Sequence, residues 1–540
     1  MREPGPSDRV EVAVVGFGPA GAVATAMLGQ SGIRTLAVDR ETGVYDKPRA
    51  IAIDHEILRH LDNLGMADDV LPHVAPFPAS QHFGAQGQLI RRIDMVPEPY
   101  PQAYVPTMVF SQPPVEAAMR AHARAHPSVE VALGTALLDL AQDEAGVTLR
   151  LRGPAGDRTV RADYVVACDG ASSGVRGMLG IELDDLVFDE PWLVVDLLVN
   201  ADALGKLPET AAQFCDPARP TTFIVGPDNH RRFEIMLLPG EDPRLMQAPE
   251  GVWRLLARWL TPDDAVLWRA ASYRFHALVA RDWRRGRVFL AGDAAHQQPP
   301  FIGQGMCQGL RDVTNLAWKL ERVLRGRSGD ALLDSYGAER GAHVRALTAR
   351  IKAIGQVICE RDPDRARERD ARLLAEGGGH PRTITRQEIV PPLTTGLLAA
   401  RGAEVREDGA REDGARGTLF PQPWIVTAEG PRRLDALTGT GWRLVLDARA
   451  APDVGEAGRG LDLRTIAIAP AQGPDGALVE RDGVVAAWFD RHGCRAAIVR
   501  PAHYVYGTAR DADALTRLVA ELAARLAPAA NPTETVRTFP

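Results

Sequence analysis

The sequence predicts an α/β protein of several domains that is built around a parallel sheet. The first observation is a glycine-rich turn between an apolar strand and a helix, within residues Val12 to Arg40. The second is a pair of turns far along the chain, Asp169-Gly170 and Gly292-Asp293, each placed after an apolar strand. The third is β-rich sequence over residues 185–280, which lies between those two turns. A Rossmann-like domain interrupted by a β-rich insertion accounts for all three observations.

The stretch from Val12 to Arg40 has the layout of a dinucleotide-binding fingerprint. A strand at 12–15 leads into the turn, a helix follows at 22–31, and a second strand at 35–38 ends on Asp39. Asp39 follows the turn at about the 20-residue spacing of a carboxylate that binds ribose hydroxyls. The turn residues that would lie against a pyrophosphate are Gly16, Gly18, Pro19, Ala20 and Gly21. This segment alone leaves open whether the nucleotide is FAD or NAD(P).

The composition is that of an ordinary globular enzyme, with 45% hydrophobic and 25% charged residues among 540. The formal net charge of −7 gives no electrostatic case for a nucleic acid or an anionic membrane as a partner. No apolar run approaches the ~20 residues that span a bilayer, and the polar N-terminus has no signal-peptide core. The five scattered cysteines form no CxxC pair and no metal-ligand spacing, so we expect no metal site and a reducing cytoplasm.

The domain boundaries follow changes in composition along the chain. We expect residues 1–184 and 281–359 to form the nucleotide-binding domain and 185–280 to form an inserted sheet that faces the substrate. Residues 360–416 are highly charged and include a tandem RE-DGA repeat, which predicts a solvated linker. Residues 417–540 alternate between strand and helix patterns and predict a small α/β domain.

Individual elements follow from apolar periodicity and from the residues that end helices. A polar loop carrying Arg49 precedes the first-domain helix, and residues 66–105 predict irregular strands and turns. Helices are predicted at 56–64, 115–125, 252–260, 329–355 and 512–526, and from Gln308 onward. Strands are predicted at 129–133, 147–151, 160–162, 164–168 and 288–291.

The three turns are expected to lie together. Gly16, Asp169 and Gly292 each begin a turn directly after, or close to the end of, an apolar strand. Because the carboxyl ends of parallel strands meet at one edge of a sheet, these turns would surround a single ligand there. Each turn alone is common, but the three together, in this order, are specific.

These motifs carry a resemblance to a known family. GFGPAG, DGASSGVR and GDAAHQQPPFIGQGM resemble the class A FAD-dependent aromatic hydroxylases, which are flavoprotein monooxygenases. PRAIAIDHEILRHL, CDPARP, RRFEIMLLPGE and GLRDVTNLAWKL are similar to segments of 3-(3-hydroxyphenyl)propanoate hydroxylases, and the resemblance covers nearly the whole chain. It implies bound FAD, NADH or NADPH as reductant, O₂, and ortho-hydroxylation of such a phenolic acid to a catechol through a C4a-hydroperoxyflavin.

The resemblance also assigns cofactor-binding roles. It implies that Asp39 binds the adenosine ribose, with Arg40 beside the adenine, and that Arg49 lies at the FAD phosphates or over the flavin. Gln112 would bond the sugar portion of the cofactor and Asp293 the ribityl chain. The remaining cofactor-binding residues would be Asp169, Gly292, Pro300, Gly303, Gly305 and Met306. Backbone N–H groups after Gly305 would offer positive potential to the anionic reduced flavin.

Hydroxyl transfer to a ring is faster when the phenol is deprotonated, so we expect a base or acceptor near the substrate hydroxyl. Asp54 and His55, which precede the first-domain helix, are the candidates for this catalytic role. The alternative is a helix N-cap for Asp54 and a surface position for His55. His296 is expected to be structural rather than a base.

The candidate substrate ligands are Tyr104 and one of the adjacent arginines Arg231 and Arg232, of which we favour Arg232. Strand alternation sends one arginine to each face of its sheet. The alternative is an exposed arginine that forms an ordinary salt bridge.

The C-terminal domain resembles the thioredoxin-like extension of phenol-hydroxylase relatives. Cys494 stands alone there, which excludes CxxC disulfide exchange and favours a role in packing or subunit contact, so a homodimer stays open. Other substrates, such as a nitrocatechol, a resorcinol or a polyketide phenol, also stay open, because the cofactor motifs do not separate them. A non-hydroxylating FAD-binding protein would keep the same motifs.

Overall fold

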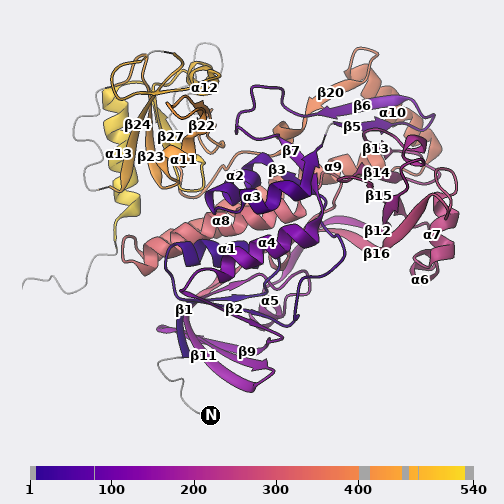
Figure 1. Ribbon diagram of the computed structural model, residues 1–540, viewed down its shortest axis with the longest axis horizontal. Coiled ribbons are helices and arrows are strands. Elements are labelled where there is room, and N and C mark those ends of the chain that lie inside the picture. The colour runs from indigo at the N-terminus through magenta and orange to yellow at the C-terminus, as the bar shows by residue number, and fades with distance from the viewer. Residues whose placement is uncertain (1–7, 78, 401–413, 453–460, 472, 529–540) are drawn as a thin grey trace, which may run out of the picture. The chain divides into compact units, whose positions relative to one another are not determined.

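The computed structural model describes residues 8–77, 79–400, 414–452, 461–471 and 473–528 (Figure 1). The chain divides into two compact units. The first comprises Met1–Val313 and Val344–Pro391, and the second comprises Thr314–His343 and Pro392–Pro540. Most of the predicted RE-DGA repeat, residues 406–413, lies outside the described residues.

The first unit contains an eight-stranded sheet with five adjacent parallel strands in the order β18-β11-β1-β2-β8. Its strands are β1 (Arg9–Val15), β2 (Thr35–Asp39), β8 (Val129–Leu133), β9 (Ala136–Asp143), β10 (Gly146–Gly153), β11 (Gly156–Ala167), β17 (Arg284–Arg285) and β18 (Val288–Leu290). The strand predicted at 129–133 is found with those bounds, whereas the strands predicted at 160–162 and 164–168 are one strand, β11. Asp163 does not interrupt β11 because its carboxylate points outward to Arg9, at 3.1 Å.

Helices α1 (Pro19–Gln30) and α4 (Gln112–Arg124) pack against each other beside this sheet (Figure 1). The small and apolar residues of α1 are buried almost all round, as expected for a helix between a sheet and a second helix. A small sheet of β3 (Ala52–Asp54), β4 (Val74–Pro76) and β7 (Thr107–Phe110) lies in the same unit, and of these strands β4 falls within residues 66–105, which were predicted to form irregular strands and turns. Helix α2 (His55–Asn63) packs beside β3 and against α3 (Ala67–Val70), whereas α5 (Gly174–Met178) lies beside β9 of the eight-stranded sheet.

A nine-stranded sheet forms the predicted β-rich insertion, in the order β19-β16-β12-β15-β14-β13-β5-β6-β20. Its strands are β5 (Ala79–Phe83), β6 (Leu89–Asp94), β12 (Leu183–Val199), β13 (Ala211–Phe214), β14 (Thr221–Val225), β15 (His230–Met236), β16 (Ala265–Ala280), β19 (His296–Gln297) and β20 (Arg382–Thr385). Helices α6 (Pro243–Met246) and α7 (Pro249–Leu256) follow β15, and Val252 and Leu256 of α7 pack on one face. The sheet therefore takes four strands from outside residues 185–280, namely β5, β6, β19 and β20.

The prediction of a solvated linker over residues 360–416 is wrong for its described first part. Residues Pro363–Glu376 form α10, which the Asp362 carboxylate caps. Arg369 of α10 is buried and donates from Nη2 to the carbonyl oxygen of Cys215 at 2.9 Å. Asp370 accepts the N–H of Ala85 at 2.7 Å. The charged composition concealed this packing because some of the charged side chains are themselves the docking contacts.

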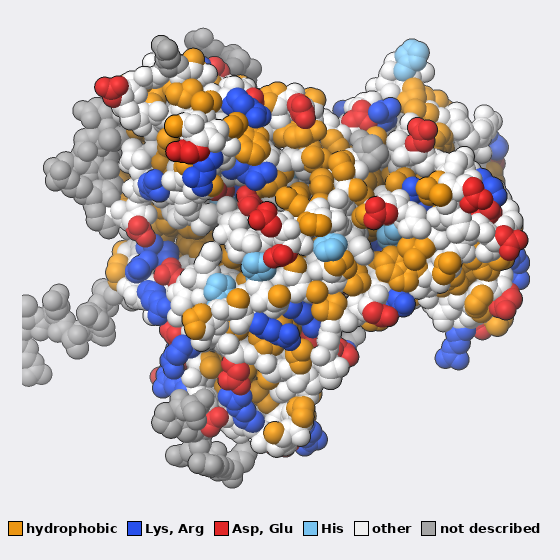
Figure 2. Space-filling view, in the orientation of Figure 1, with side chains coloured by type: hydrophobic (Ala, Val, Ile, Leu, Met, Phe, Trp, Pro, Cys, Tyr) orange, Lys and Arg blue, Asp and Glu red, His pale blue; other side chains and the backbone are white. Residues whose placement is uncertain are grey.

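Helices α8 (Gly305–Leu324) and α9 (Asp334–Ile358) each contribute to both units of the chain. A turn of 3₁₀ helix, Asp330–Leu333, precedes α9, where the sequence predicted one helix over 329–355. Among the described residues no helix is both long and apolar enough to cross a bilayer. Figure 2 shows acidic and basic side chains interspersed on the face in view, in keeping with 70 Asp and Glu against 63 Lys and Arg.

The second unit contains a five-stranded mixed sheet in the order β25-β24-β23-β26-β27. Its strands are β23 (Trp442–Asp447), β24 (Leu463–Ala469), β25 (Leu478–Val479), β26 (Ala496–Val499) and β27 (Val505–Ala509), and a hairpin of β21 (Trp424–Ile425) and β22 (Arg432–Arg433) precedes it. Its helices are α11 (Leu434–Thr438), α12 (Val484–His492) and α13 (Ala512–Leu526). The closing helix has the predicted bounds, and a thioredoxin-like identity for this domain stays a prediction.

A buried acid joins the C-terminal sheet to the helical part of the same unit. Glu339 of α9 is fully buried and accepts Arg500 Nη2 at 2.6 Å, Lys319 Nζ at 2.9 Å and Asn315 Nδ2 at 2.7 Å. Its other oxygen accepts the N–H of Leu397 at 2.8 Å. Burial alone would raise the pKa of Glu339, but the positive charges of Arg500 and Lys319 hold it well below its usual value.

We expect Glu339→Gln to lower the free energy of unfolding by about 3–5 kcal/mol, because Arg500 and Lys319 would stay buried without a counter-charge. The matched control is Glu376→Gln, whose exposed pair with Arg372 should be worth about 0–1 kcal/mol. Urea unfolding followed by circular dichroism measures both. Equal losses in the two variants would contradict the anchoring role of Glu339.

Candidate active site

The three predicted turns follow three neighbouring strands of the parallel sheet. Strand β1 pairs in parallel with β11, and β11 pairs in parallel with β18. Gly16 follows β1, Asp169 lies just after β11, and Gly292 lies just after β18. The predicted convergence at the carboxyl edge of one sheet is therefore confirmed.

The glycines of the first turn differ in their surroundings. Gly16 has φ +93°, and a Cβ there would lie 2.3 Å from the carbonyl oxygen of Cys168. A Cβ on Gly21 would lie 1.9 Å from the carbonyl oxygen of Gly16. A Cβ on Gly18 would have no described protein atom within 4 Å. The first and third glycines thus permit close packing, whereas the second leaves space at the start of α1, where helix N–H groups favour an anion.

Asp39 lies at the adjacent edge of the first turn. Its carboxylate accepts the N–H of Phe17 at 2.7 Å and that of Glu41 at 2.9 Å. These contacts fix the carboxylate beside the glycine turn while each oxygen can still accept a further bond. Arg40 is exposed and its Nε lies 3.4 Å from the carboxylate of Glu41.

Helix α8 packs against the turn after β18 and stabilises it. Gly292 has φ +60°, and the position of its missing Cβ lies 3.4 Å from Ala20 and 3.7 Å from Gly309. The buried Asp312 carboxylate accepts the N–H of Gly292 and the Nε2 of His296, both at 2.8 Å. His296 is itself buried and stacks on Trp283. These contacts give His296 the structural role expected from the sequence.

Asp293 projects from this turn. Its side chain is open to solvent, yet burial among the surrounding protein raises its pKa, against the opposing charges of His296 and Arg49. The two observations fit together if solvent reaches the carboxyl group from one side only. A hydroxyl-bearing ligand on that side would find a hydrogen-bond acceptor.

The turn after β11 is tied to the turn after β18. Asp169 accepts the hydroxyl of Ser173 at 2.5 Å and the N–H of Val175 at 3.0 Å, which caps α5. Arg176 of α5 donates to the carbonyl oxygen of Ala294 at 2.9 Å. Asp169 therefore stabilises the turn after β11. Its assigned contact with the cofactor stays a prediction.

Gln112 contacts the loop that carries Arg49. Arg49 is exposed, with its guanidinium 4.7 Å from the centre of the Tyr45 ring. Gln112 is buried, accepts the N–H of Ala50 at 2.7 Å and donates to Glu116 at 2.9 Å. Gln112 thus positions the loop that carries Arg49.

Residues 300–306 lead into the N-terminus of α8. Gly303 has φ +61°, and a Cβ there would lie 2.8 Å from the Cβ of Ala52. Gly305 begins α8, has no described protein atom within 4 Å of its Cβ position, and is partly exposed, as are Pro300 and Met306. The first turn of an α-helix has N–H groups without partners in the helix, and at Gly305 this turn of α8 has open space beside it.

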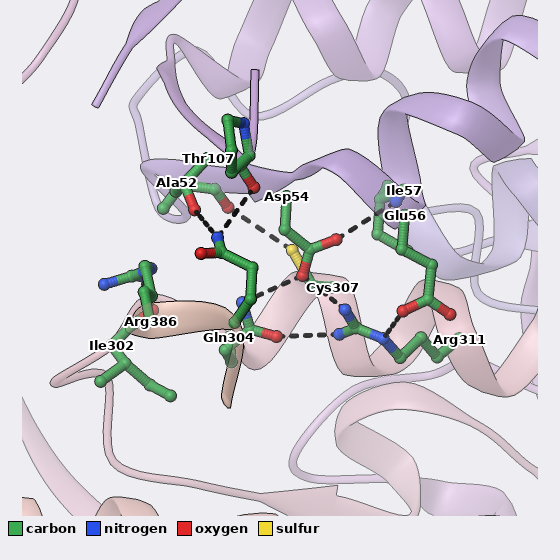
Figure 3. Close-up of polar contacts among 12 residues, drawn as sticks. Ala52, Asp54, Glu56, Ile57, Thr107, Ile302, Gln304, Cys307, Arg311 and Arg386 are labelled. Atoms are coloured by element: carbon green, nitrogen blue, oxygen red, sulfur yellow. Dashed lines mark hydrogen bonds and ion pairs between the residues drawn. The ribbon is translucent and has the colours of Figure 1, made fainter. Parts of the chain in front are cut away.

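Asp54 belongs to a buried polar network (Figure 3). One oxygen caps α2 by accepting the N–H of Ile57 at 3.2 Å, and the other accepts Gln304 Nε2 at 3.1 Å and Arg311 Nη2. Burial alone would raise the pKa of Asp54, but the Arg311 guanidinium holds it below its usual value. The N-cap alternative is therefore the one observed, and these contacts argue against a role as general base.

His55 is buried rather than at the surface. Burial lowers its pKa to about 4, although Asp54 and Glu56 oppose the change. A histidine with that pKa is a weak base. Its Nδ1 has no hydrogen-bond partner among the described residues.

The two candidate substrate ligands lie in different places. Tyr104 is buried with its hydroxyl bonded to Asp62 of α2. Arg232 is buried on β15, where its Nε donates to Asp196 and its Nη1 to the carbonyl oxygen of Arg49, both at 2.7 Å. Arg231 bonds backbone carbonyls near its own turn, so the two arginines do separate by strand alternation.

Comparison with known proteins agrees with this geometry. A family model described as FAD binding domain matches residues 9–351, and one described as HcaD C-terminal domain matches residues 417–525. A probable NADH-specific resorcinol 4-hydroxylase from Rhodococcus jostii (strain RHA1) is 37% identical over 528 residues, 96% of each chain. The chain belongs to the class A FAD-dependent aromatic hydroxylases.

Further relatives of this hydroxylase include a 3-(3-hydroxy-phenyl)propionate/3-hydroxycinnamic acid hydroxylase from Burkholderia vietnamiensis (strain G4 / LMG 22486). It is 34% identical over 524 residues, which cover 92% of this chain and 93% of the relative. A crystal structure of aklavinone-11 hydroxylase with FAD and aklavinone is 25% identical, with a TM-score of 0.77 over 95% of this chain and 98% of that one. The flavin-dependent monooxygenase PieE is 24% identical, with a TM-score of 0.80 over 97% and 100%, which shows a shared fold.

The hydroxylase also has buried charged residues beside the predicted positions that sequence reasoning missed, namely Asp312, Arg311, Asp196, Arg269 and Glu234. Asp312 and Arg311 stand in GLRDVTNL, a segment used only for its resemblance and its helical periodicity. Asp196 interrupts the apolar run WLVVDLLV, and Glu234 interrupts RRFEIMLL. An acid inside an apolar strand is the signal that could have found both, since burial of a charge requires a partner.

The residues around the first turn fit FAD, because Gly18 leaves room for a pyrophosphate at a helix N-terminus and Asp293 offers an acceptor beside it. We expect Gly21→Ala to destabilise the apoprotein by about 1–3 kcal/mol, because its methyl group meets the carbonyl oxygen of Gly16.

The matched variant is Gly18→Ala, which has an allowed φ of −69° and no steric conflict. It should unfold like the wild-type apoprotein but retain less FAD, since the added methyl group fills pyrophosphate space. Urea unfolding and the flavin absorbance per mole of protein measure the two effects. Full FAD retention in Gly18→Ala would show that this glycine does not face the cofactor.

Proposed function

We propose that this hydroxylase uses NADH, FAD and O₂ to add a hydroxyl group to a phenol at the position next to the existing hydroxyl, giving a catechol. The observation that carries the proposal is the convergence of the three turns at the carboxyl edge of the parallel sheet. The loop that carries Arg49 links this edge to the nine-stranded sheet, because Arg49 acts electrostatically on Asp293 and its carbonyl oxygen accepts from Arg232 at 2.7 Å. Bound FAD supplies the oxidation of the nicotinamide and the activation of O₂. The protein binds FAD and the phenol, orients them and shields the reacting ring from water.

Different residues of the site would bind different parts of FAD. The first N–H groups of α1 would hold the pyrophosphate, and Asp39 would accept the ribose hydroxyls. Asp293 would accept a hydroxyl of the ribityl chain. The N-terminus of α8, after Gly305, would stabilise negative charge on the ring, and Arg49 would add positive charge nearby.

Apolar residues of the sheet would keep water away from the reacting ring. Trp192, Phe275 and Phe301 form one buried aromatic group, with ring centres 5.5–6.1 Å apart. Phe301 follows Pro300 in the loop that leads to α8. An apolar wall beside the flavin position limits side reactions with water.

The relatives support two kinds of substrate. One relative is named for resorcinol, and others are named for 3-(3-hydroxyphenyl)propionate, which is the phenolic acid expected from the sequence. The first of these names also specifies NADH, which favours NADH over NADPH here. The five free cysteines favour a reducing compartment such as the cytoplasm.

We expect Asp293→Asn to fold normally and to lose most of its FAD, because an amide is a poorer acceptor for the ribityl hydroxyl than a carboxylate. The control is Asp282→Asn, whose exposed carboxylate pairs with Arg285. Flavin absorbance after gel filtration reports cofactor content, and thermal unfolding reports the fold. Stoichiometric FAD in Asp293→Asn would mean that this turn does not bind the cofactor.

The reaction itself is tested by following NADH consumption, catechol formation and peroxide formation with a panel of phenols. We expect at least one phenol to stimulate NADH oxidation about tenfold or more and to yield catechol in near-equal amount. The same reactions with NADPH give the reductant preference. Peroxide without catechol for every phenol would contradict hydroxylation while leaving FAD binding intact.

A further inference from the structure

Two loops that flank the proposed flavin position contact the same face of the nine-stranded sheet. Arg232 of β15 donates to the carbonyl oxygen of Arg49 at 2.7 Å. On the neighbouring strand β12, the Trp192 ring lies 5.6 Å from the ring of Phe301. The stretch of sheet between these two contacts is therefore the part that faces the reacting end of the cofactor.

Glu234 lies in the middle of that stretch. Along β15, Arg232 pairs with Asp196, Glu234 with Val194, and Met236 with Trp192. Alternate residues of a strand share a face and lie about 7 Å apart, so Glu234 stands between the two loop contacts. Only 2% of its surface is exposed.

Glu234 and Arg232 each have a buried polar atom without a hydrogen-bond partner in the described chain. These atoms are Oε2 of Glu234 and Nη2 of Arg232. Thr222, which lies opposite Glu234 on β14, donates its hydroxyl to Gln213 at 2.5 Å instead. Unpaired buried polar atoms are costly, so an unpaired acceptor and an unpaired donor on one face point to a polar ligand group there.

The arginines of this face already have a buried counter-charge in Asp196. The buried Asp196 carboxylate already accepts Arg232 Nε at 2.7 Å and His230 Nε2 at 2.8 Å, and it lies 3.4 Å from Arg269 Nη1. Burial alone would raise the pKa of Asp196, but Arg232 holds it at about 2, so this acid stays ionised.

Burial raises the pKa of Glu234 to about 7, although Arg232 opposes the change, so near neutral pH this acid carries only part of its charge. A substrate carboxylate that faced Oε2 of Glu234 would have to share a proton with it, because two ionised carboxylates in contact repel each other. A hydroxyl group has no such cost, because its O–H can donate to Glu234 Oε2 while its oxygen accepts from Arg232 Nη2. The neighbouring side chains of Val194, Met236 and Trp192 offer apolar contact to an aromatic ring.

We propose that Glu234 and Arg232 together bind a hydroxyl group of an uncharged hydroxybenzene, so that the substrate class is a neutral diphenol such as a benzenediol rather than a phenolic acid. This inference rests on the proposed hydroxylase function and narrows its substrate. It also gives Arg232 a hydroxyl ligand in place of the carboxylate expected from the sequence.

The test uses the FAD-loaded full chain with resorcinol as the neutral probe and 3-(3-hydroxyphenyl)propanoate as the anionic probe. Binding is measured by the change in flavin absorbance, and turnover by NADH consumption and product analysis. We expect the wild type to bind resorcinol at least tenfold more tightly than the acid. Glu234→Gln should weaken resorcinol binding at least tenfold, leave FAD content unchanged and leave binding of the acid unchanged or tighter.

The matched control is Glu250→Gln, an exposed acid of α7 in the same sheet domain, which should behave as the wild type. Preferential binding and hydroxylation of the acid by the wild type would overturn this inference and leave the hydroxylase function standing, whether or not Glu234→Gln folds. Unchanged resorcinol binding in a folded Glu234→Gln would overturn the role of Glu234. Failure of every phenol to be hydroxylated would overturn the proposed function as well.

Discussion

The architecture depends on how closely three strand ends approach one another. At Gly16 a side chain has no room, because the carbonyl oxygen of Cys168 lies where a Cβ would be. At Gly292 the backbone packs on Ala20 and Gly309, so α1, α8 and the turn after β18 meet at one point. This contact brings three segments that lie far apart in the sequence to one edge of the sheet, and the β-rich insertion lies between two of them along the chain.

Buried acids paired with arginines or lysines recur as the means of joining distant segments. Asp54 meets Arg311, Asp196 meets Arg232, and Glu339 meets Arg500 and Lys319. A buried charge without a partner is strongly destabilising, so each pair specifies which segments lie together. In the nine-stranded sheet the buried pair of Asp196 and Arg232 has a second effect. Because Asp196 uses the charge of Arg232, that arginine has a hydrogen-bond donor to offer but little charge for a substrate carboxylate.

The sequence was a good guide wherever a local pattern has a local cause. Strand, turn and helix around Gly16 to Gly21 were predicted because backbone geometry at glycine and apolar periodicity act within a few residues. It failed for α10, where charged side chains such as Arg369 and Asp370 are docking contacts and charge therefore did not mean solvent exposure. Asp54 and His55 were correctly placed at a helix start, but their burial and the Arg311 pair depend on a segment far along the chain.

The sequence by itself determined that this protein has a dinucleotide-binding fingerprint and that it belongs to an FAD-dependent hydroxylase family, and it predicted which turns lie together. Those conclusions rest on short motifs, and the family follows from three of them taken together. The tertiary structure decided which acids are already neutralised and which polar atoms stay unpaired. Glu234 and Arg232 acquire their meaning only when β12, β14 and β15 are in register, because hydrogen-bond partners come from neighbouring strands and not from neighbouring residues.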